Sequence, residues 1–536
     1  MIKDKKLLMI GILLCCMIMV PLFNQGIMCG DELTTRFNAM NGFGFFLKSF
    51  MQEQLSKGRA LAIVVALPSY LGFLFSGNEC FRVVQIISIF LDVFLFSYLV
   101  NKLMKDKYFS IFLGVFLVAF LPISFENTAP NAFCTLFNFP FAFLLLSYIF
   151  FLDYIDNKNI SKIFISMILL FVAEMCYEAF IALTPLYLFI LLYRMNIKQE
   201  FKKIVVYLSI PFFTSCLYLV TYILCSKIYV SNYAGNQLGI SDIKGSIAII
   251  GHLFKAAIPG FFIWGSDKYR FLLKIFWNFS VAEMFRVGIL VISFIYVLFN
   301  LFGKRKLNKT EMIWKKHIGV IISSIICMIL PSLPIAVSEM YQGGVGENGF
   351  VALPVTYFSY YFAVLIICYI VWFLLKDNWK IVMAAVCICV ILTGIQFSNG
   401  VFSQEQNRNF NRLEQMENCL KTDMFKWFGN TEFVSEDMFK TINSMAFYDS
   451  YWTQFSAYCG NGAVISNKEV SDKQNRIYYR DNKMYVWYNN ELYVFTYDTV
   501  MGEDLVIVTD EKCSFQQYKN PIRDHGFNIY HFQNLN

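Results

Sequence analysis

The chain has 536 residues, of which 57% are hydrophobic and only 15% are charged. Soluble domains carry about 25% charged residues, so this composition excludes an ordinary soluble enzyme. The formal net charge of +7 is unevenly divided: residues 398–536 carry 13 Lys and Arg against 18 Asp and Glu, a net −5, and the remainder carries +12. The basic excess therefore belongs to the apolar part of the chain, which argues against a nucleic-acid partner.

Apolar runs long enough to cross a hydrocarbon layer of about 30 Å recur through residue 397. We therefore predict an all-α polytopic membrane protein over residues 1–397, with about eleven transmembrane helices and additional re-entrant or juxtamembrane helices. The expected spans are 7–23, 83–100, 109–123, 133–152, two short helices within 163–193, 204–225, 284–302, 318–337, 353–375 and 381–397.

Basic loops indicate which way the runs cross, because Lys and Arg concentrate in cytoplasmic loops. Three lysines precede the first run and place the amino terminus inside the cell. Residues 61–75 are few for a span and contain Pro68, so we expect a re-entrant or surface helix there, and a second at 247–264. Residues 163–193 are too many for one span and have basic flanks on both sides, which predicts two helices that turn near 174–178.

The tail at 398–536 has the composition of a small α+β domain, which this topology places outside the cytoplasm. Apolar residues recur with helical spacing over 404–427. Residues 484–495 form two β-rich runs around Asn489-Asn490, a hairpin pattern, and 504–509 predicts a further strand. Most of the 15 cysteines lie in apolar runs, no Cys/His spacing suits zinc, and three tail cysteines do not imply a disulfide.

An adjacent pair of acids, Asp31 and Glu32, follows the first apolar run directly. One carboxylate of such a pair can accept a proton from a nucleophilic hydroxyl, while the other orients it or binds a divalent cation such as Mg²⁺ or Mn²⁺. A solvated loop also explains the pair, and on the pair alone it is the more frequent case, because charged residues outside a membrane need no special role. The residues alone leave both interpretations open, including whether a metal takes part.

The context of this pair resembles the GT-C superfamily, integral-membrane glycosyltransferases that use polyprenyl-phosphate sugars. Relatives in outline are the protein mannosyltransferases, the lipid A aminoarabinose transferases and the O-antigen glucosyltransferases. The shared order, over roughly residues 7–200, is an apolar helix, the Asp31-Glu32 pair, a polar segment, a short Pro-containing helix, 76–82 and a span that ends in a basic loop. The resemblance implies that 24–82 is a catalytic outer loop, with Asp31 as general base, Glu32 in support and Arg82 as a family-like position.

The resemblance implies inverting transfer of a sugar from a polyprenyl-phosphate donor to a hydroxyl of a cell-surface glycan or lipid-linked acceptor. Glu126 and Glu178 lie in apolar surroundings and are candidate supporting acids, whereas we expect Asp92 and Glu174 to be helix-packing partners. Basic residues on the outer face would supply the positive charge that binds the donor phosphate. For each of them, snorkelling of the side chain toward lipid headgroups is an alternative explanation. These residues are Arg36, Arg59, Arg82, Lys255, Lys268 and Arg270.

Two other classes remain open on the sequence. A flippase or transporter for a lipid-linked saccharide favours paired half-repeats, which the sequence does not show. A glycan polymerase or ligase would act outside through Arg-rich loops rather than an acid pair. The expected partners in every case are membrane lipids and a lipid-linked saccharide at the cell membrane, and the sequence specifies neither the sugar nor the acceptor.

Overall fold

The structure, a computed structural model, divides into two compact units. Met1–Gln25 and Asn38–Gln404 form a helical unit, and Gly26–Phe37 with Glu405–Asn536 form a C-terminal unit. The structure describes residues 5–23, 30–74, 79–123, 134–229, 243–261, 280–303, 314–342, 353–375, 378–435, 449–460, 462–466, 475–480, 483–497, 515–517 and 522–534.

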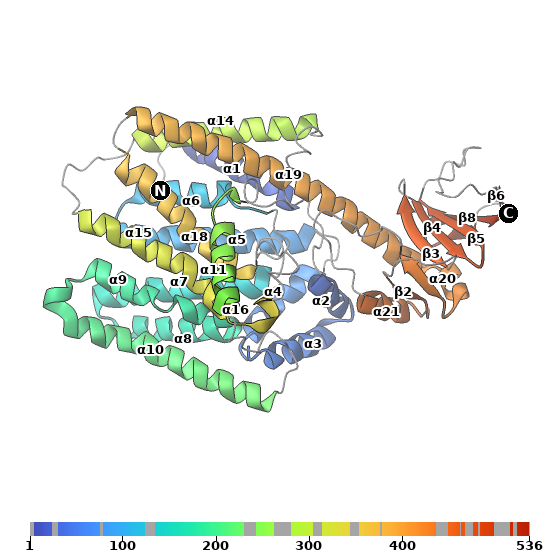
Figure 1. The fold of residues 1–536 in the computed structure, drawn as a ribbon, viewed down its shortest axis with the longest axis horizontal. Coiled ribbons are helices and arrows are strands. Elements are labelled where there is room, and N and C mark those ends of the chain that lie inside the picture. Colours follow the sequence, from blue (N-terminus) through green and yellow to red (C-terminus); the bar gives the residue numbers. More distant parts are fainter. Residues whose placement is uncertain are drawn as a thin grey trace. The chain divides into compact units, whose positions relative to one another are not determined.

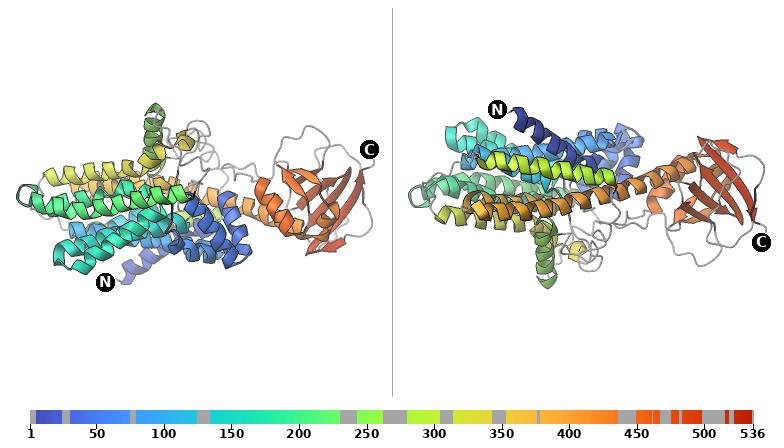
Figure 2. Two further views of the ribbon diagram at one scale, coloured as in Figure 1. Left: turned by 90° about the horizontal axis from the view of Figure 1, so that it is seen from below. Right: turned by 90° about the horizontal axis from the view of Figure 1, so that it is seen from above.

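The helical unit contains long helices that lie side by side along roughly one direction, with α11 running across them (Figure 1; Figure 2). Its helices are α1 Lys5–Phe23, α3 Phe43–Ser56, α4 Ile63–Leu74, α5 Glu79–Met104, α6 Lys107–Ala119, α7 Cys134–Asn157, α8 Ile160–Cys176, η1 Glu178–Leu183, α9 Leu186–Arg194, α10 Ile197–Ile228, α11 Ile243–Ala256, α14 Val281–Gly303, α15 Trp314–Ile329, η4 Leu330–Ser332, α16 Leu333–Ala336, α18 Pro354–Tyr369, η5 Ile370–Leu374 and α19 Asn378–Lys421, which continues into the C-terminal unit.

Seven helices in the described part of the chain are long and apolar enough to cross a membrane. Seven of the eleven predicted spans coincide with these helices, whereas the other four fall on helices that are not among the candidate spans, α1, α6, α8 and α9, so the count of eleven stays a prediction. The predicted membrane class is thus compatible with the helix lengths. The seven candidate spans are Arg82–Met104, Thr135–Asn157, Ile197–Ile228, Val281–Gly303, His317–Ala336, Pro354–Leu374 and Trp379–Gln404.

The predicted break within 163–193 is confirmed. Helix α8 ends at Cys176, Tyr177 has extended backbone angles, and the 3₁₀ turn η1 begins at Glu178 before α9. Arg194, the last residue of α9, donates hydrogen bonds to the Asp156 carboxylate near the end of α7, 2.9 and 3.1 Å away. Since α8 starts just after α7, the segment enters and leaves at the same end of the unit.

Basic turns collect at that end. Lys102 near the end of α5 forms an ion pair with Asp153 near the end of α7. Lys158, between α7 and α8, donates to the Tyr207 hydroxyl in the first half of α10, 2.7 Å away. We call this the basic end, because the turns between α5 and α6, α7 and α8, and α9 and α10 meet there.

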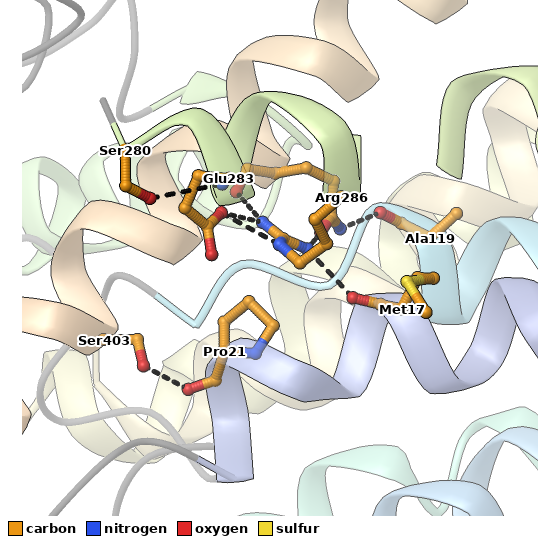
Figure 3. Close-up of polar contacts among 8 residues, drawn as sticks. Met17, Pro21, Ala119, Ser280, Glu283, Arg286 and Ser403 are labelled. Carbon is orange, nitrogen blue, oxygen red and sulfur yellow. Dashed lines mark hydrogen bonds and ion pairs between the residues drawn. The ribbon is translucent and has the colours of Figure 1, made fainter. Parts of the chain in front are cut away.

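Toward the opposite end, Arg286 of α14 connects three helices (Figure 3). Its Nη1 donates to the Met17 carbonyl at 2.9 Å and its Nη2 donates to the Gln396 carbonyl at 2.8 Å. Pro21, four residues after Met17, has no N–H to donate to the Met17 carbonyl, as a residue at that position of a helix otherwise does. The guanidinium therefore supplies the hydrogen bond that proline removes from α1.

The same network includes a carboxylate and the end of α6. Arg286 Nε donates to Glu283 Oε2, 2.9 Å away, which balances the charge of this buried guanidinium. Gln396 Nε2 donates to the Ala119 carbonyl, the last residue of α6, at 2.8 Å. Side chains thus hold α1, α6, α14 and α19 in register.

The C-terminal unit combines helices with a sheet of order β2-β1-β3-β4-β5-β8-β6, in which β7 also pairs with β8. Strand β1 is parallel to β2 and β3, and the other pairs are antiparallel. The predicted α+β class is confirmed. Its further elements are α2 Gly30–Met40, α20 Asp423–Phe428, α21 Asp449–Tyr458, β1 Glu432–Ser435, β2 Val464–Ser466, β3 Arg476–Arg480, β4 Lys483–Tyr488, β5 Glu491–Thr496, β6 Phe515–Gln517, β7 Ile522–Asp524 and β8 Phe527–Asn534.

The predicted hairpin is confirmed in position and turn. Strands β4 and β5 pair with Tyr488 opposite Glu491, so the loop is Asn489-Asn490 alone. Both residues have positive φ, 50° and 66°, as a type I′ turn requires. The predicted strand at 504–509 lies outside the described residues.

The helix predicted at 404–427 differs from the structure in both bounds. Helix α19 runs without interruption from Asn378 to Lys421, and α20 follows. The Thr422 side chain accepts from the Phe425 N–H and caps α20, which separates the two helices. The expected domain start at 398 falls inside α19, seven residues before Glu405, where the C-terminal unit resumes.

Candidate functional site

The predicted acid pair lies in the first turn of α2, a helix of the C-terminal unit. Asp31 is the second residue of α2, and Glu32 is buried, with 1% of its surface exposed. Phe37, on the same helix, packs edge-on against Phe455 and Tyr458 of α21, with ring centroids 6.4 and 5.7 Å apart. Helix α2 is therefore an integral part of a folded domain rather than a solvated loop.

Arg36 fixes α2 to the C-terminal part of α19. Its guanidinium forms a buried ion pair with Glu417 and lies 5.7 Å from the centre of the Phe410 ring. Burial raises the pKa of the neighbouring Glu414 carboxyl, which the Arg36 charge counteracts in part. Arg36 already has a carboxylate partner, so a role in phosphate binding would require it to leave Glu417.

Arg59 and Glu178, two predicted site residues 119 positions apart, meet in the helical unit. Arg59 Nε and Nη2 donate to the two carboxylate oxygens of Glu178 at 2.8 and 2.7 Å, a bidentate pair. The guanidinium also lies 5.0 Å from the centre of the Tyr177 ring. The pair joins the segment after α3 to the turn after α8.

The end of α3 positions Arg59. Gly58 has φ of 77°, its N–H donates to the Leu55 carbonyl, and the Arg59 N–H donates to the Gln54 carbonyl, both at 2.9 Å. A side chain at Gly58 would overlap the Tyr222 ring of α10. Glycine thus permits both the left-handed turn and the close approach of α10.

The pair has an electrostatic consequence at the turn. Burial by itself raises the pKa of the Glu178 carboxyl, but the charge and hydrogen bonds of Arg59 outweigh that effect and hold this pKa below its ordinary value. Glu178 is consequently ionised at neutral pH. As a carboxylate already bound by a cation, it is suited to orienting Arg59 rather than to accepting a proton.

The remaining predicted cations and acids are placed as follows. Arg82 is fully buried at the start of α5 and donates to Gln85 Oε1 on the same helix. Lys255 is exposed on α11. Glu126, Lys268 and Arg270 lie outside the described residues.

Two acids inside the helical unit bond to neighbouring elements, as expected for helix-packing partners. Glu174 Oε1 accepts hydrogen bonds from Ser215 of α10 at 2.6 Å and from Thr184 at 3.0 Å. Asp92 Oδ2 accepts from the Tyr357 hydroxyl of α18 at 2.9 Å. Each has a second oxygen without a hydrogen-bond partner among the described residues.

One group in the described part of the chain combines ligand types suited to a metal. Oxygen or nitrogen atoms of Asp423, Asp524 and His525 lie within 4.8 Å of one another. Asp524 Oδ2, however, accepts from the Asp423 and Met424 N–H groups at 2.7 and 3.2 Å and thereby caps α20. This structural role accounts for the cluster, so the predicted divalent cation stays a prediction.

Sequence reasoning missed the Arg286 network. Three signals were available: an Arg at the third position of the apolar run 284–302, a Gln near the end of the run 381–397, and Pro21 inside the first helix. Individually these are ordinary features of membrane helices. Only the tertiary structure shows that the Arg286 side chain donates to the Met17 carbonyl, to which Pro21 cannot donate.

The fold is that of a mainly helical protein with a small α+β unit, and its apolar helices are compatible with a multi-pass membrane protein. Comparison with family models, with curated proteins and with solved structures finds no significant match.

Proposed function

We propose that the chain is a membrane glycosyltransferase that moves a sugar from a polyprenyl-phosphate donor to a hydroxyl acceptor with inversion. The observation that carries this proposal is the Asp31-Glu32 pair at the start of α2, seven residues after the apolar helix α1 ends. In the sequence the pair thus follows directly on an apolar helix, and a lipid-linked substrate would present its head group where such a helix leaves the membrane.

Asp31 would act as the general base. It takes the proton of the acceptor hydroxyl, whose oxygen attacks the anomeric carbon while the bond from that carbon to the phosphate oxygen breaks. The polyprenyl phosphate leaves with the bonding electron pair, and the proton passes from Asp31 to water. The folded setting of α2 supports this role, because a base must be held in a fixed position to act on the acceptor.

Cations would stabilise the charge that grows on the departing phosphate. Arg82, which donates to Gln85 at the start of α5, and Lys255, which is exposed on α11, are the described candidates for this role. Arg59 would take part only as an Arg59–Glu178 pair. A divalent cation would add charge neutralisation at the phosphate.

The proposed orientation follows from the basic end. Lys and Arg concentrate in cytoplasmic loops, so we infer that the basic end faces the cytoplasm and that the amino terminus lies there too. Helix α1 then ends at the outer face. The C-terminal unit, with Asp31, is extracytoplasmic in this topology.

A flippase or transporter is the second candidate, favoured by the buried acid Asp92 within a candidate span. A glycan polymerase or ligase has no separate observation in its favour.

The test uses a strain of the native host without this chain, complemented with the wild type, Asp31→Asn or the exposed control Glu53→Gln. Removing a general base costs about 10²- to 10⁴-fold in rate, so Asp31→Asn should lose the surface sugar while Glu53→Gln keeps it. A non-permeant reagent then locates the accumulated lipid-linked sugar. Accumulation on the outer face supports a transferase, accumulation inside supports a flippase, and full activity of Asp31→Asn rejects Asp31 as the base.

A further inference from the structure

A group of polar side chains lies buried where α5, α7 and α18 meet. Ser88 and Asp92 of α5 are four residues apart and so lie on one face of that helix. Asn138 Nδ2 of α7 donates to Ser88 Oγ at 3.0 Å, and the Tyr357 hydroxyl of α18 donates to Asp92 Oδ2. Each of these four side chains is at most 2% exposed.

Aromatic packing confirms that the three helices converge at this point. Phe141, one turn after Asn138 on α7, has its ring centroid 6.2 Å from that of Tyr357 and 5.2 Å from that of Tyr361. The hydroxyls of Tyr357 and Tyr361 are 2.7 Å apart. The polar group is therefore enclosed by packed side chains.

The group has an imbalance of acceptors. Asp92 Oδ1 and Asn138 Oδ1 have no hydrogen-bond partner among the described residues, although both are fully buried. The neighbouring donors point elsewhere: the Tyr357 hydroxyl donates to Asp92 Oδ2, one N–H of the Asn138 amide donates to Ser88, and the Ser88 hydroxyl donates to the Gln85 carbonyl at 2.7 Å. Two buried oxygens that no described donor reaches call for a positively charged or hydrogen-donating occupant.

Charge narrows the choice of occupant. No described Lys or Arg forms an ion pair with Asp92, and Arg82, ten residues earlier on α5, lies about 15 Å away along the helix axis. A water molecule would donate hydrogen bonds but leave the carboxylate charge uncompensated in an apolar span. A single cation bound between the two oxygens would give both a partner and would also compensate the charge.

We propose that Asp92 and Asn138 form the core of a binding site for one monovalent cation of the Na⁺ class, with the Ser88 and Tyr357 hydroxyls beside it. All the available atoms are oxygens, which hard cations prefer. Asp92 is the one carboxylate in the group, so a monovalent ion leaves the site neutral. This site is independent of Asp31 and of sugar transfer.

The test measures cation binding by the purified full-length chain in nanodiscs. Thermal unfolding is followed in NaCl and in choline chloride at equal ionic strength and pH, and radioactive Na⁺ binding gives the stoichiometry. A ligand that binds only the folded state raises the unfolding midpoint with concentration. We expect the midpoint to rise with Na⁺, and about one ion to bind per chain.

Variants connect the response to the site. Asp92→Asn should abolish the response to Na⁺, and Asn138→Ala should weaken Na⁺ affinity about tenfold or more. The matched control is Glu174→Gln, which alters the other buried acid and should keep the wild-type response. If Asp92→Asn does not fold, Na⁺ binding by Asn138→Ala tests whether this group of residues is the binding site.

Three results would overturn the proposal: no bound Na⁺ on the wild type, an unchanged Na⁺ response in Asn138→Ala, or a midpoint that depends on pH alone. The last result would mean that a proton rather than a metal ion compensates Asp92. Tyr357 and Tyr361 are the other titratable groups facing Asp92, so Tyr357→Phe should leave such a pH response in place.

Discussion

The helical unit and the C-terminal unit keep their elements in register by different means. In the helical unit, side chains connect residues far apart in the chain: Arg286 reaches the carbonyl of Met17, 269 positions away, and Tyr357 reaches Asp92, 265 positions away. In the C-terminal unit, backbone pairing joins the consecutive strands β3, β4 and β5. A helix satisfies its own backbone, so its register against a neighbour depends on side chains, whereas a strand obtains register from the backbone itself.

This comparison predicts that single side-chain changes cost more in the helical unit. The largest effect is expected for Arg286→Met, which leaves Glu283 without its cation and the Met17 carbonyl without a donor. We expect a loss of about 3–5 kcal/mol in unfolding free energy, measured by denaturant unfolding in nanodiscs. The double variant Arg286→Met/Glu283→Gln should recover part of the lost stability. An unchanged stability of Arg286→Met would contradict the conclusion that side chains hold the helical unit in register.

The Arg59–Glu178 pair should contribute less, because Glu178 is about one third exposed. A double-mutant cycle with Arg59→Met and Glu178→Gln should give a coupling of about 1–3 kcal/mol at neutral pH. The folded-state pKa of Glu178 lies below its unfolded value, so the coupling is fully present above the unfolded pKa. It should vanish as pH falls through the lowered pKa, and a coupling that persists at lower pH would contradict the ion pair.

Gly58→Ala tests the close packing of α10 against the end of α3. The change introduces strain at φ of 77° and an overlap with Tyr222, with an expected cost of about 1–3 kcal/mol. Gly460, two residues after the end of α21, is the matched control, since its φ is 75° but a Cβ there meets nothing within 4 Å. Equal costs for Gly58→Ala and Gly460→Ala would show that the Tyr222 contact adds nothing.

The smallest effect is expected in the hairpin of the C-terminal unit. Asn490→Gly should stabilise that unit by about 0.5 kcal/mol, because glycine adopts the left-handed conformation of the second turn position without strain. Asn490→Ala should instead destabilise it, and thermal unfolding separates the two variants. A destabilising Asn490→Gly would contradict the type I′ turn.

Two buried or half-buried acids show how the same residue type takes different roles. Glu178 has an Arg partner for both oxygens, whereas Asp92 has a tyrosine on one oxygen and no cation among the described residues. From the sequence both lie within or beside apolar runs, and we expected a supporting role for Glu178 and helix packing for Asp92. The position of Arg59 after α3, which no local pattern indicates, makes one of them an ion pair.

The sequence by itself determined what depends on neighbouring residues. Hydrophobic run lengths predicted the apolar helices, basic flanks predicted the break at Tyr177, and Asn489-Asn490 predicted the hairpin. In each case the free energy is local: burial of one apolar run, or the φ preference of two turn residues.

Only the tertiary structure decided which distant segments belong together. Gly26–Phe37 groups with Glu405–Asn536 because Arg36 pairs with Glu417, 381 positions away, and Phe37 packs on α21. The role of Pro21 is visible only in the tertiary structure, where Arg286 donates to the Met17 carbonyl in place of the N–H that Pro21 lacks. Such pairings become favourable only once packing has offset the entropy of closing long loops, so no short stretch of sequence encodes them.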